Sequence, residues 1–240
     1  MNRLTDRLQL IAGQIDNGET MADIGTDHGF LPIYLKENDI SPAVIMCDIS
    51  EPSLAKAKAA AGAYQFGGDV DFRAGDGLKV LKSGEVDDIV IAGMGGMLIK
   101  DILDADMDKT CSFKKYILQP RNNAGLLRYW LISSGFTILS NRLVREGKFI
   151  CEIITAVPPK ASQECRLTLT EGLLPPGSAC WDFPEDMRES SPELAGEYAL
   201  VKLGIEEKIR KGILKSCNIC EADIAAVEKR MEYFRKMADG

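Results

Sequence analysis

The chain is poor in the residues on which several kinds of catalytic site depend. It contains a single histidine, His28, among 240 residues, which excludes a metal site built from several histidines and acid–base exchange between two of them. No apolar run approaches the roughly 18 residues of a membrane-spanning helix. Residues 1–19 carry charges throughout and lack the apolar core of a signal peptide. We therefore expect a cytoplasmic protein with no membrane partner.

Positive charge is in the minority, with 29 Lys and Arg against 36 Asp and Glu and a net charge of −7. This argues against a protein that coats nucleic acid indiscriminately, because phosphate binding depends on basic clusters, but it leaves room for a local basic face. Seven scattered cysteines without an export signal predict reduced thiols. Cys217 and Cys220 form one Cys-x-x-Cys pair without further ligands nearby, so we predict no metal site.

Strand-like and helix-like segments alternate over the first 157 residues, after an amphipathic helix that carries Leu4, Leu8, Ile11 and Ile15. This alternation predicts an α/β fold with a parallel sheet covered on both faces. Phe136–Val144 and Phe149–Val157 predict an antiparallel hairpin at the sheet edge. The expected inner strands are Met21–Ile24, Ala43–Cys47, Ile89–Ala92 and Tyr116–Leu118, and two of the expected helices are Pro52–Tyr64 and Ala124–Ser133.

Composition divides the chain into three parts. Residues 1–158 form the α/β domain, and residues 159–191, rich in proline and charge, predict a connector with little regular structure. Residues 192–240 predict two helices folded back as a hairpin, with a break at Ser216–Cys220. The apolar positions that indicate these helices are Ile205, Ile209, Ile213, Ile224, Val227, Met231 and Phe234.

The first expected strand ends in an acid and a glycine, Asp23 and Gly25. Gly25 and Gly29 would let the backbone approach a ligand closely. Taken alone this segment also fits a tight turn that binds nothing, because the Gly-x-Gly-x-x-Gly pattern of a dinucleotide-binding turn is not met.

The next three strand ends favour a bound nucleoside. Asp48 ends the second strand, where a carboxylate can accept hydrogen bonds from both ribose hydroxyls. Asp76, between two glycines, follows the third strand and can bind an adenine amino group. The fourth strand leads into Gly93–Gly96, a loop with little side-chain bulk. Ligands of open α/β sheets bind at such carboxyl ends of strands.

The expected ligand is neutral or cationic. The chain has no Gly-x-x-x-x-Gly-Lys-Ser/Thr loop, and Asp27 stands where a pyrophosphate would bring negative charge. S-adenosylmethionine, with its ammonium and sulfonium groups, fits an acid-lined site better than NAD or ATP.

Four segments resemble a known family: residues 22–32, Gly75–Leu78, Ile91–Gly96 and Leu118–Pro120. They are similar to the class I S-adenosylmethionine-dependent methyltransferases and, more narrowly, to the bacterial tRNA (adenine(22)-N1)-methyltransferases. The resemblance covers residues 2 to about 157 and extends in arrangement to the C-terminal helices. It implies a Rossmann-like sheet with a terminal antiparallel hairpin and a small helical hairpin domain that orients RNA. The sequence departs from the family mainly within residues 160–195.

The resemblance also implies a role for each matching residue. The methionine part of the cofactor would be lined by Asp23, Gly25 and Asp27. The ribose would be held by Asp48, next to Ile49. The adenine would be held by Asp76 and Gly77, and the methyl group would be bordered by Gly93 and Met94.

Methylation at N1 of adenine makes modest demands on the chain, because N1 has a free lone pair and needs no strong base. Methyltransferases that act on exocyclic amines commonly carry an Asn/Asp-Pro-Pro-aromatic loop where this chain has Gly93–Gly96, which argues against N6 chemistry. Gln119 and Asn122 are candidates to bind the base edge, although Asn122 or Asn123 equally fits a helix cap. His28 would accept a proton or hydrogen-bond the loop, and Asp27 would orient the base or bind only the cofactor.

N1 lies on the Watson–Crick edge, so the target adenine must be unpaired or flipped out of the stack. We expect tRNA as partner, bound near its D-arm, and a monomer or weak dimer. Candidate phosphate-binding residues, which equally fit solvated faces, are Lys114, Lys115, Arg121, Arg128, Arg142, Arg145, Lys148, Lys208, Lys211 and Lys215.

Two other functions fit the sequence. One is a class I methyltransferase that acts on a protein or a small molecule. The other is a non-catalytic RNA-binding protein with a vestigial cofactor site, against which the intact Asp23, Asp48 and Asp76 speak.

Overall fold

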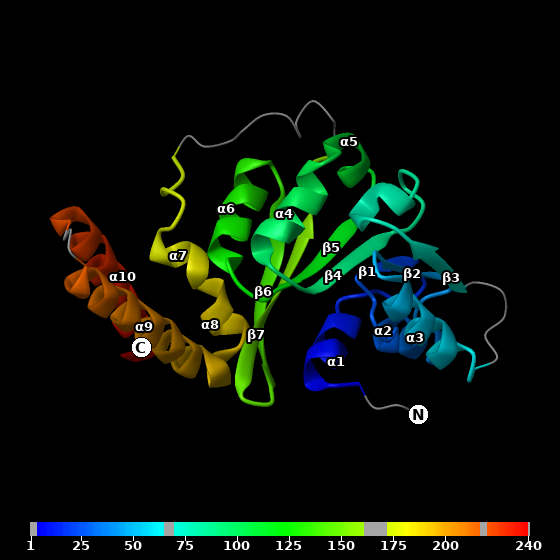
Figure 1. Cartoon of the computed structure of the whole chain (residues 1–240), viewed down its shortest axis with the longest axis horizontal. Helices are drawn as coiled ribbons and strands as arrows, with labels where there is room; N and C mark the ends of the chain where they lie inside the picture. The colour runs from blue at the N-terminus through cyan, green and yellow to red at the C-terminus, as the bar shows by residue number, and fades with distance from the viewer. Residues whose placement is uncertain (1–3, 65–69, 161–171, 217–219, 240) are drawn as a thin grey trace.

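The computed structural model describes residues 4–64, 70–160, 172–216 and 220–239. Within these ranges one sheet is built from β1 (Met21–Ile24), β2 (Val44–Asp48), β3 (Val70–Ala74), β4 (Asp88–Met94), β5 (Lys115–Pro120), β6 (Thr137–Glu146) and β7 (Phe149–Val157). The order across the sheet is β3-β2-β1-β4-β5-β7-β6 (Figure 1). The first five strands are parallel, and β7 runs antiparallel to both β5 and β6. The predicted parallel sheet with an antiparallel edge hairpin is confirmed.

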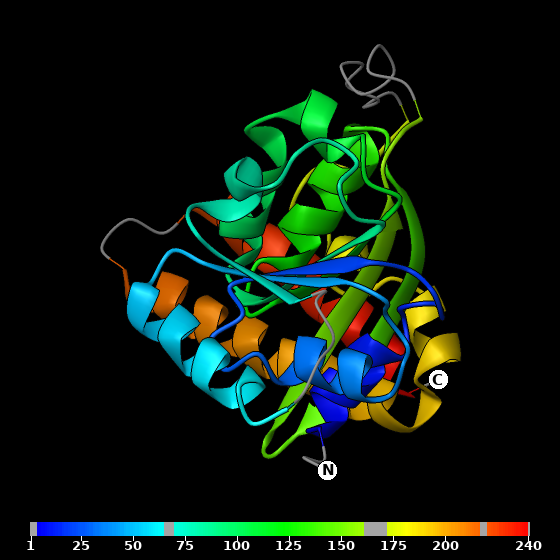
Figure 2. The same cartoon turned by 90° about the vertical axis from the view of Figure 1, so that its right-hand side faces the viewer.

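Helices cover both faces of the sheet, which Figure 2 shows nearly edge-on between two helical layers. One layer consists of α1 (Asp6–Ala12), α2 (Phe30–Glu37) and α3 (Glu51–Ala61). The other consists of the 3-10 helix η1 (Gly77–Val80), α4 (Gly96–Asp104), α5 (Met107–Thr110) and α6 (Ala124–Ser133).

The alternation of side chains along each strand creates two separate cores. Ile89 and Ile91 of β4 belong to the core under α4 and α6, whereas Val90 between them belongs to the core under α1, α2 and α3. All three side chains are fully buried. Strands covered on both faces need apolar residues at every position, which explains why the inner strands are continuous apolar runs.

The C-terminal part packs onto the edge hairpin. It comprises α7 (Ala179–Asp182), α8 (Asp186–Ser190), α9 (Pro192–Lys215) and α10 (Glu221–Asp239). The two long helices form an arm beyond β6 and β7 (Figure 1), as the predicted hairpin requires. A third apolar core includes Leu143 of β6, Phe183, Met187, Tyr198 and Phe234.

Two expectations for this part are wrong. The predicted connector contains α7 and α8, whose Phe183 and Met187 are completely buried; residues 161–171 of it lie outside the described ranges. Ile205 and Ile209 of α9 are nearly half exposed and do not form its packing face. Instead Glu206 is buried, because Arg230 of α10 donates two hydrogen bonds to its carboxylate, at 2.9 and 2.7 Å.

The described residues include five cysteines, of which four are free. Cys47, Cys151, Cys180 and Cys220 are free, as predicted, but Cys111 is disulfide-bonded, which the sequence did not predict. Within the described ranges no helix combines the length and apolar character needed to cross a bilayer. The same ranges contain no group of three or more metal-ligating side chains suited to a metal ion.

Candidate active site

The site lies at the carboxyl ends of the central strands. β1 is paired with β2 on one side and with β4 on the other, so the chain's crossover direction changes at β1. Ile24, the last residue of β1, lies in register with Cys47 and with Ile91. The carboxyl ends of these three strands therefore lie at the same edge of the sheet, with β4 extending furthest, at the switch point where open α/β sheets bind their ligands.

The loop after β1 is held in a conformation that requires glycine. Gly25 has φ +83°, and its N–H donates to the Cys47 carbonyl at 2.7 Å. A Cβ on Gly25 would lie 2.4 Å from Cε of Met94. The loop after β1 therefore contacts the end of β4 through Gly25 and Met94, two of the residues predicted to bind the cofactor.

Asp48 is fixed by backbone donors from two loops. Its Oδ1 accepts the N–H of Ser50 at 2.8 Å, and its Oδ2 accepts the N–H of Asp27 at 3.4 Å. The N–H of Gly75 donates to the Asp48 carbonyl at 3.0 Å. Ile49 is 74% exposed beside it. Asp48, the predicted ribose-binding residue, therefore connects the loop after β1 through its carboxylate with the loop after β3 through its backbone carbonyl.

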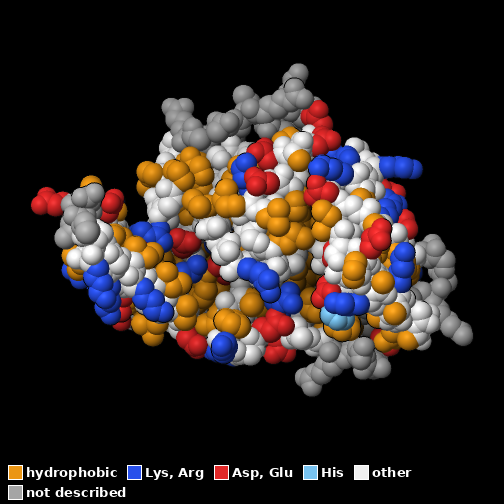
Figure 3. Space-filling model, viewed as in Figure 1, with side chains coloured by type: hydrophobic (Ala, Val, Ile, Leu, Met, Phe, Trp, Pro, Cys, Tyr) orange, Lys and Arg blue, Asp and Glu red, His pale blue; other side chains and the backbone are white. Residues whose placement is uncertain are grey.

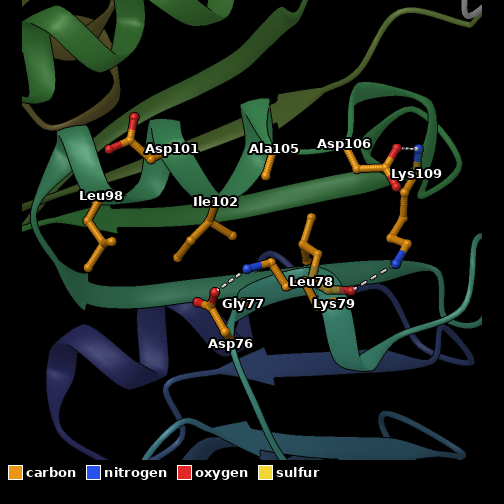
Figure 4. A pocket seen from close by; sticks show the side chains of 10 residues that line it. All are labelled: Asp76, Gly77, Leu78, Lys79, Leu98, Asp101, Ile102, Ala105, Asp106 and Lys109. Carbon is orange, nitrogen blue, oxygen red and sulfur yellow. Dashed lines mark hydrogen bonds and ion pairs between the residues drawn. The ribbon is translucent and has the colours of Figure 1, made fainter.

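Asp76 and Gly77 lie at one end of a cavity of about 440 Å³ between η1 and α4 (Figure 4). Leu98 and Ile102 give this end two apolar walls, suited to the faces of a planar ring. Lys79 forms an ion pair with the Asp76 carboxylate. Both side chains are more than half exposed, so a ligand amino group can displace the lysine at little cost.

Asp23 is a buried acid in an unfavourable setting. It is 7% exposed, and its pKa is raised to about 6 by desolvation and by the charge of Asp48, while Thr26 and Arg7 act in the opposite direction. A carboxylate held in this way gains much from a positively charged ligand. It is the group in the site that most favours a cation.

Asp27 is, by contrast, half exposed and firmly ionised. Desolvation opposes ionisation, but the hydrogen bonds from Lys56 and His28 outweigh it and lower the pKa of Asp27. His28 Nδ1 lies 2.7 Å from Oδ2 of Asp27, and Lys56 Nζ lies 3.2 Å from Oδ1. The His28 ring also stacks on Phe30. These contacts fit the role of His28 in holding the loop.

Gln119 lies behind the loop after β4 and is 4% exposed. Its Oε1 accepts the N–H of Gly93 at 3.0 Å and an N–H of Arg7 at 3.3 Å, and its Nε2 donates to the Pro120 carbonyl at 3.2 Å. These internal partners occupy the amide. The structure therefore favours a positioning role for Gln119 over direct binding of a base.

Asn122 lies beside the glycines that begin α4. The N–H of Gly96 donates to the Asn122 carbonyl at 3.0 Å, and a Cβ on Gly95 would lie 3.1 Å from Asn122 Oδ1. The N-cap of α6 is Asn123, and its side chain makes no capping hydrogen bond. Asn123 therefore occupies the predicted cap position without a capping hydrogen bond through its side chain, and the exposed Asn122 amide adjoins the segment where the methyl group is expected.

Several candidate phosphate ligands are already engaged inside the protein. Lys115 Nζ lies 3.0 Å from Asp16 and 2.9 Å from Glu19. Arg128 is 1% exposed and donates to Asn141, Glu152 and the Trp181 carbonyl. The prediction that these two residues belong to an RNA-binding face is wrong, because acids and carbonyls of the fold occupy them.

Other candidate phosphate ligands remain on the surface, where Lys and Arg side chains gather along the helical arm (Figure 3). The exposed candidates are Arg121, Arg142, Lys148, Lys208, Lys211 and Lys215. Arg145 and Lys114 are exposed as well, but Arg145 pairs with Glu197 of α9 and Lys114 pairs with Asp87.

Arg7 is the site residue that the sequence did not reveal. Arg7 lies in the amphipathic first helix, and no local sequence motif distinguishes it from other polar residues of that helix. It lies 112 positions before its partner Gln119, and only the packing of α1 against the end of the sheet brings the two together. A lone arginine on the polar face of the first helix was the only available signal.

The chain is similar in sequence and structure to known methyltransferases. The methyltransferase-domain family model matches residues 4–154. A tRNA (adenine(22)-N(1))-methyltransferase of Bacillus subtilis is 38% identical over 154 residues, which span 64% of this chain and 65% of that relative, just under two thirds of its length.

Two solved structures match the whole chain. The B. subtilis M1A22 tRNA methyltransferase is 29% identical, with a TM-score of 0.78 over 100% of both chains. A Mycoplasma capricolum relative, determined in complex with S-adenosyl-homocysteine, is 26% identical, with a TM-score of 0.76 over 98% of both chains. The chain is therefore similar to bacterial tRNA (adenine(22)-N1)-methyltransferases in sequence and in structure, and it belongs to the methyltransferase-domain family.

Proposed function

We propose that this protein transfers the methyl group of S-adenosylmethionine to N1 of an adenine in tRNA, at position 22 in the D-arm region. The observation that carries the proposal is the meeting of acidic and glycine-rich loops at one edge of the sheet, next to the exposed amide of Asn122. We place this protein in the cytoplasm, as a monomer or weak dimer.

The residues present fit the cofactor. Asp23, Gly25 and Asp27 would hold the methionine part, where a buried carboxylate with a raised pKa favours an ammonium group. Asp48 would hold the ribose, next to Ile49. The cavity beside Asp76 and Gly77 would take the adenine, since its volume of about 440 Å³ suits a nucleoside-sized group.

When bound, S-adenosylmethionine supplies an electrophilic methyl group on a cationic sulfur. The lone pair of adenine N1 forms the new bond as the sulfur–carbon bond breaks, and the positive charge passes from sulfur to the base. The protein needs chiefly to align the two atoms, which can supply roughly 7–11 kcal/mol of the barrier. Gly93, Met94 and Gly95 leave space for the base, and we assign Asn122 to its edge.

Asp27 and His28 can assist without accepting a proton. The methylated base carries a positive charge, and Asp27 remains ionised near neutral pH because its pKa is lowered. We assign to Asp27 the stabilisation of that charge, in addition to its contact with the cofactor. His28 would orient the Asp27 carboxylate through the 2.7 Å contact.

The RNA would lie across the exposed basic side chains of the α/β domain and the helical arm. Residues 1–158 would carry the catalysis and residues 192–240 would orient the tRNA. Residues 159–191 would connect them, and α7 and α8 belong to the packed unit rather than to a loose linker.

The test is transfer of a tritiated methyl group to unmodified tRNA, followed by nucleoside analysis. We expect labelled 1-methyladenosine, and no label in a tRNA whose adenine 22 is replaced by guanine. Asn122→Ala should leave cofactor binding intact and reduce turnover. N6-methyladenosine, label in protein or in small molecules, or no labelled product at all would contradict the proposal.

A further inference from the structure

Arg7 of α1 joins three parts of the molecule next to the proposed methyl-transfer site. Its Nε forms an ion pair with Glu146, the last residue of β6. Its Nη1 donates to Oε1 of Gln119 at 3.3 Å. The Arg7 side chain is 22% exposed, so most of it is enclosed between α1, the edge hairpin and β5. A single side chain thus fixes α1 and the hairpin relative to the site.

Gln119 links Arg7 to Gly93, at the end of β4 where the base would bind. The same Oε1 accepts the N–H of Gly93 at 3.0 Å. Gly93 has φ +78°, and a Cβ placed there would meet no atom within 4 Å. This end of β4, where the strand is irregular between Ala92 and Met94, therefore borders open space on one side and is anchored by Gln119 on the other. Without Arg7, Gln119 loses the donor that opposes its rotation away from Gly93.

Arg7 also acts on the buried acid of the site. The groups that influence the charge of Asp23 are the hydroxyl of Thr26, the guanidinium of Arg7 and the carboxylate of Asp48, and Asp23 in turn acts on the thiol of Cys47. Among these Arg7 is the one cation. It favours the ionised form of Asp23, which desolvation and Asp48 oppose.

We propose that Arg7 is a positioning residue of the methyl-transfer site, which holds Gly93 at the end of β4 through Gln119. This inference rests on the proposed function, since it assigns a purpose to both contacts. The geometric part requires the guanidinium, with its two separate donors, whereas the electrostatic part requires only a positive charge.

Two variants of Arg7 separate the geometric effect on Gly93 from the electrostatic effect on Asp23. Arg7→Lys retains the charge but cannot donate to Glu146 and Gln119 in the same geometry, and Arg7→Gln removes both. Lys36→Gln is the matched control, because it removes one cation that donates to the Pro42 carbonyl, before the amino end of β2. For each full-length protein three quantities are measured: the affinity for S-adenosylmethionine by calorimetry as a function of pH, the amide resonance of Gly93 without ligand, and single-turnover methylation of tRNA.

For the wild type we expect the affinity to weaken as the pH falls through about 6, where Asp23 takes up a proton. Arg7→Lys should keep that midpoint, shift the Gly93 resonance and lower the methylation rate roughly tenfold. Arg7→Gln should show the same two changes and also move the midpoint of binding to higher pH, with about three- to tenfold weaker binding near pH 6. Lys36→Gln should match the wild type throughout.

An unchanged Gly93 resonance and methylation rate in both Arg7 variants would overturn the positioning role. A wild-type midpoint in Arg7→Gln would overturn the electrostatic role. Circular dichroism shows whether Arg7→Gln is folded. If it is not, the Arg7→Lys results still decide the geometric part. Glu146→Gln, with Arg7 intact, then decides whether loss of the ion pair alone changes the Gly93 resonance and the methylation rate. Failure of the proposed function would be distinct, because the wild type itself would then neither bind S-adenosylmethionine nor methylate tRNA.

Discussion

The two ends of the sheet are both rich in acids, but the amino end pairs more of them with lysines of the protein. At the amino ends of β4 and β5, Lys115 Nζ lies within 3.4 Å of carboxylate oxygens of Asp16, Glu19 and Asp88. The neighbouring Lys114 lies 2.7 Å from Asp87. Lys114 and Lys115 thus compensate the exposed and partly buried acids of this end, whereas burial still raises the pKa of Asp88 to about 7.

At the carboxyl ends the compensation is incomplete. Asp48 accepts hydrogen bonds from backbone N–H groups, and Asp23 is faced by Arg7, which is itself paired with Glu146. The difference shows that acidic side chains alone do not define a binding site. Buried or partly buried acids without a matching internal cation are the ones that favour a charged ligand.

The largest expected effect comes from Asp48→Asn compared with Asp87→Asn at the opposite end. Loss of the charged acceptor for the ribose should weaken binding of S-adenosylmethionine roughly a hundredfold, because hydrogen bonds to charged groups contribute about 1.5–3 kcal/mol each. Asp87→Asn should leave the affinity unchanged and lower the free energy of unfolding by about 1 kcal/mol. Calorimetry and urea denaturation measure these changes, and equal affinities in the two variants would remove the distinction between the ends.

A smaller effect on tRNA binding should distinguish the exposed lysines of α9 from Lys114, which pairs with Asp87. Changing Lys208, Lys211 and Lys215 to glutamate should weaken tRNA binding roughly tenfold and flatten its salt dependence, because phosphate contacts release counterions. Lys114→Gln should change neither, since Lys114 already pairs with Asp87. Filter binding at several salt concentrations gives both quantities. A loss of affinity in Lys114→Gln that equals the loss in the α9 variant would contradict the assignment of the RNA face.

The smallest expected effect is on stability, from Asp23→Asn compared with Asp88→Asn. Both acids are buried, and burial is the main cause that raises the pKa of Asp23 to about 6 and that of Asp88 to about 7. The folded state therefore binds a proton that the unfolded chain releases near pH 4, and stability from these groups is lost as the pH rises through the raised pKa values. Both variants should be more stable than the wild type by about 1 kcal/mol near pH 8 and no more stable near pH 4.

Only Asp23→Asn should also weaken cofactor binding. Thermal unfolding with and without S-adenosylmethionine distinguishes the two variants, since ligand binding raises the unfolding temperature. If Asp88→Asn lost the ligand-induced increase as well, the cost of a buried acid would not be specific to the site.

The sequence predicted the inner strands and their acids well, because both follow from local pattern. Met21–Ile24 and Ala124–Ser133 have the predicted bounds, and a parallel arrangement of such strands places Asp23, Asp48 and Asp76 at one edge of the sheet. The side-chain roles in the cofactor site remain predictions. The family resemblance supplied the chemistry, and the topology is the reason why residues far apart in the chain can take part in it.

Features that depend on distant packing were not predictable. The roles of Arg7 and Gln119 depend on a contact across 112 residues. The burial of Arg128 depends on Glu152 and on a carbonyl of α7. The helices α7 and α8 are too short to be indicated by periodicity and are stabilised by the third core. For α9, the ion pair between Glu206 and Arg230 decides which face is buried.

The central claim, that the acids at the carboxyl ends await a cationic ligand, is tested most directly by a calorimetric comparison of two ligands. S-adenosylmethionine is compared with 5′-methylthioadenosine, which has the adenosine part but neither the ammonium nor the sulfonium charge, from about pH 5 to about pH 8. We predict that S-adenosylmethionine binds at least roughly tenfold more tightly near pH 8, and that this advantage shrinks below about pH 6 as Asp23 becomes protonated. Equal affinities near pH 8, or an advantage that does not change with pH, would contradict the claim.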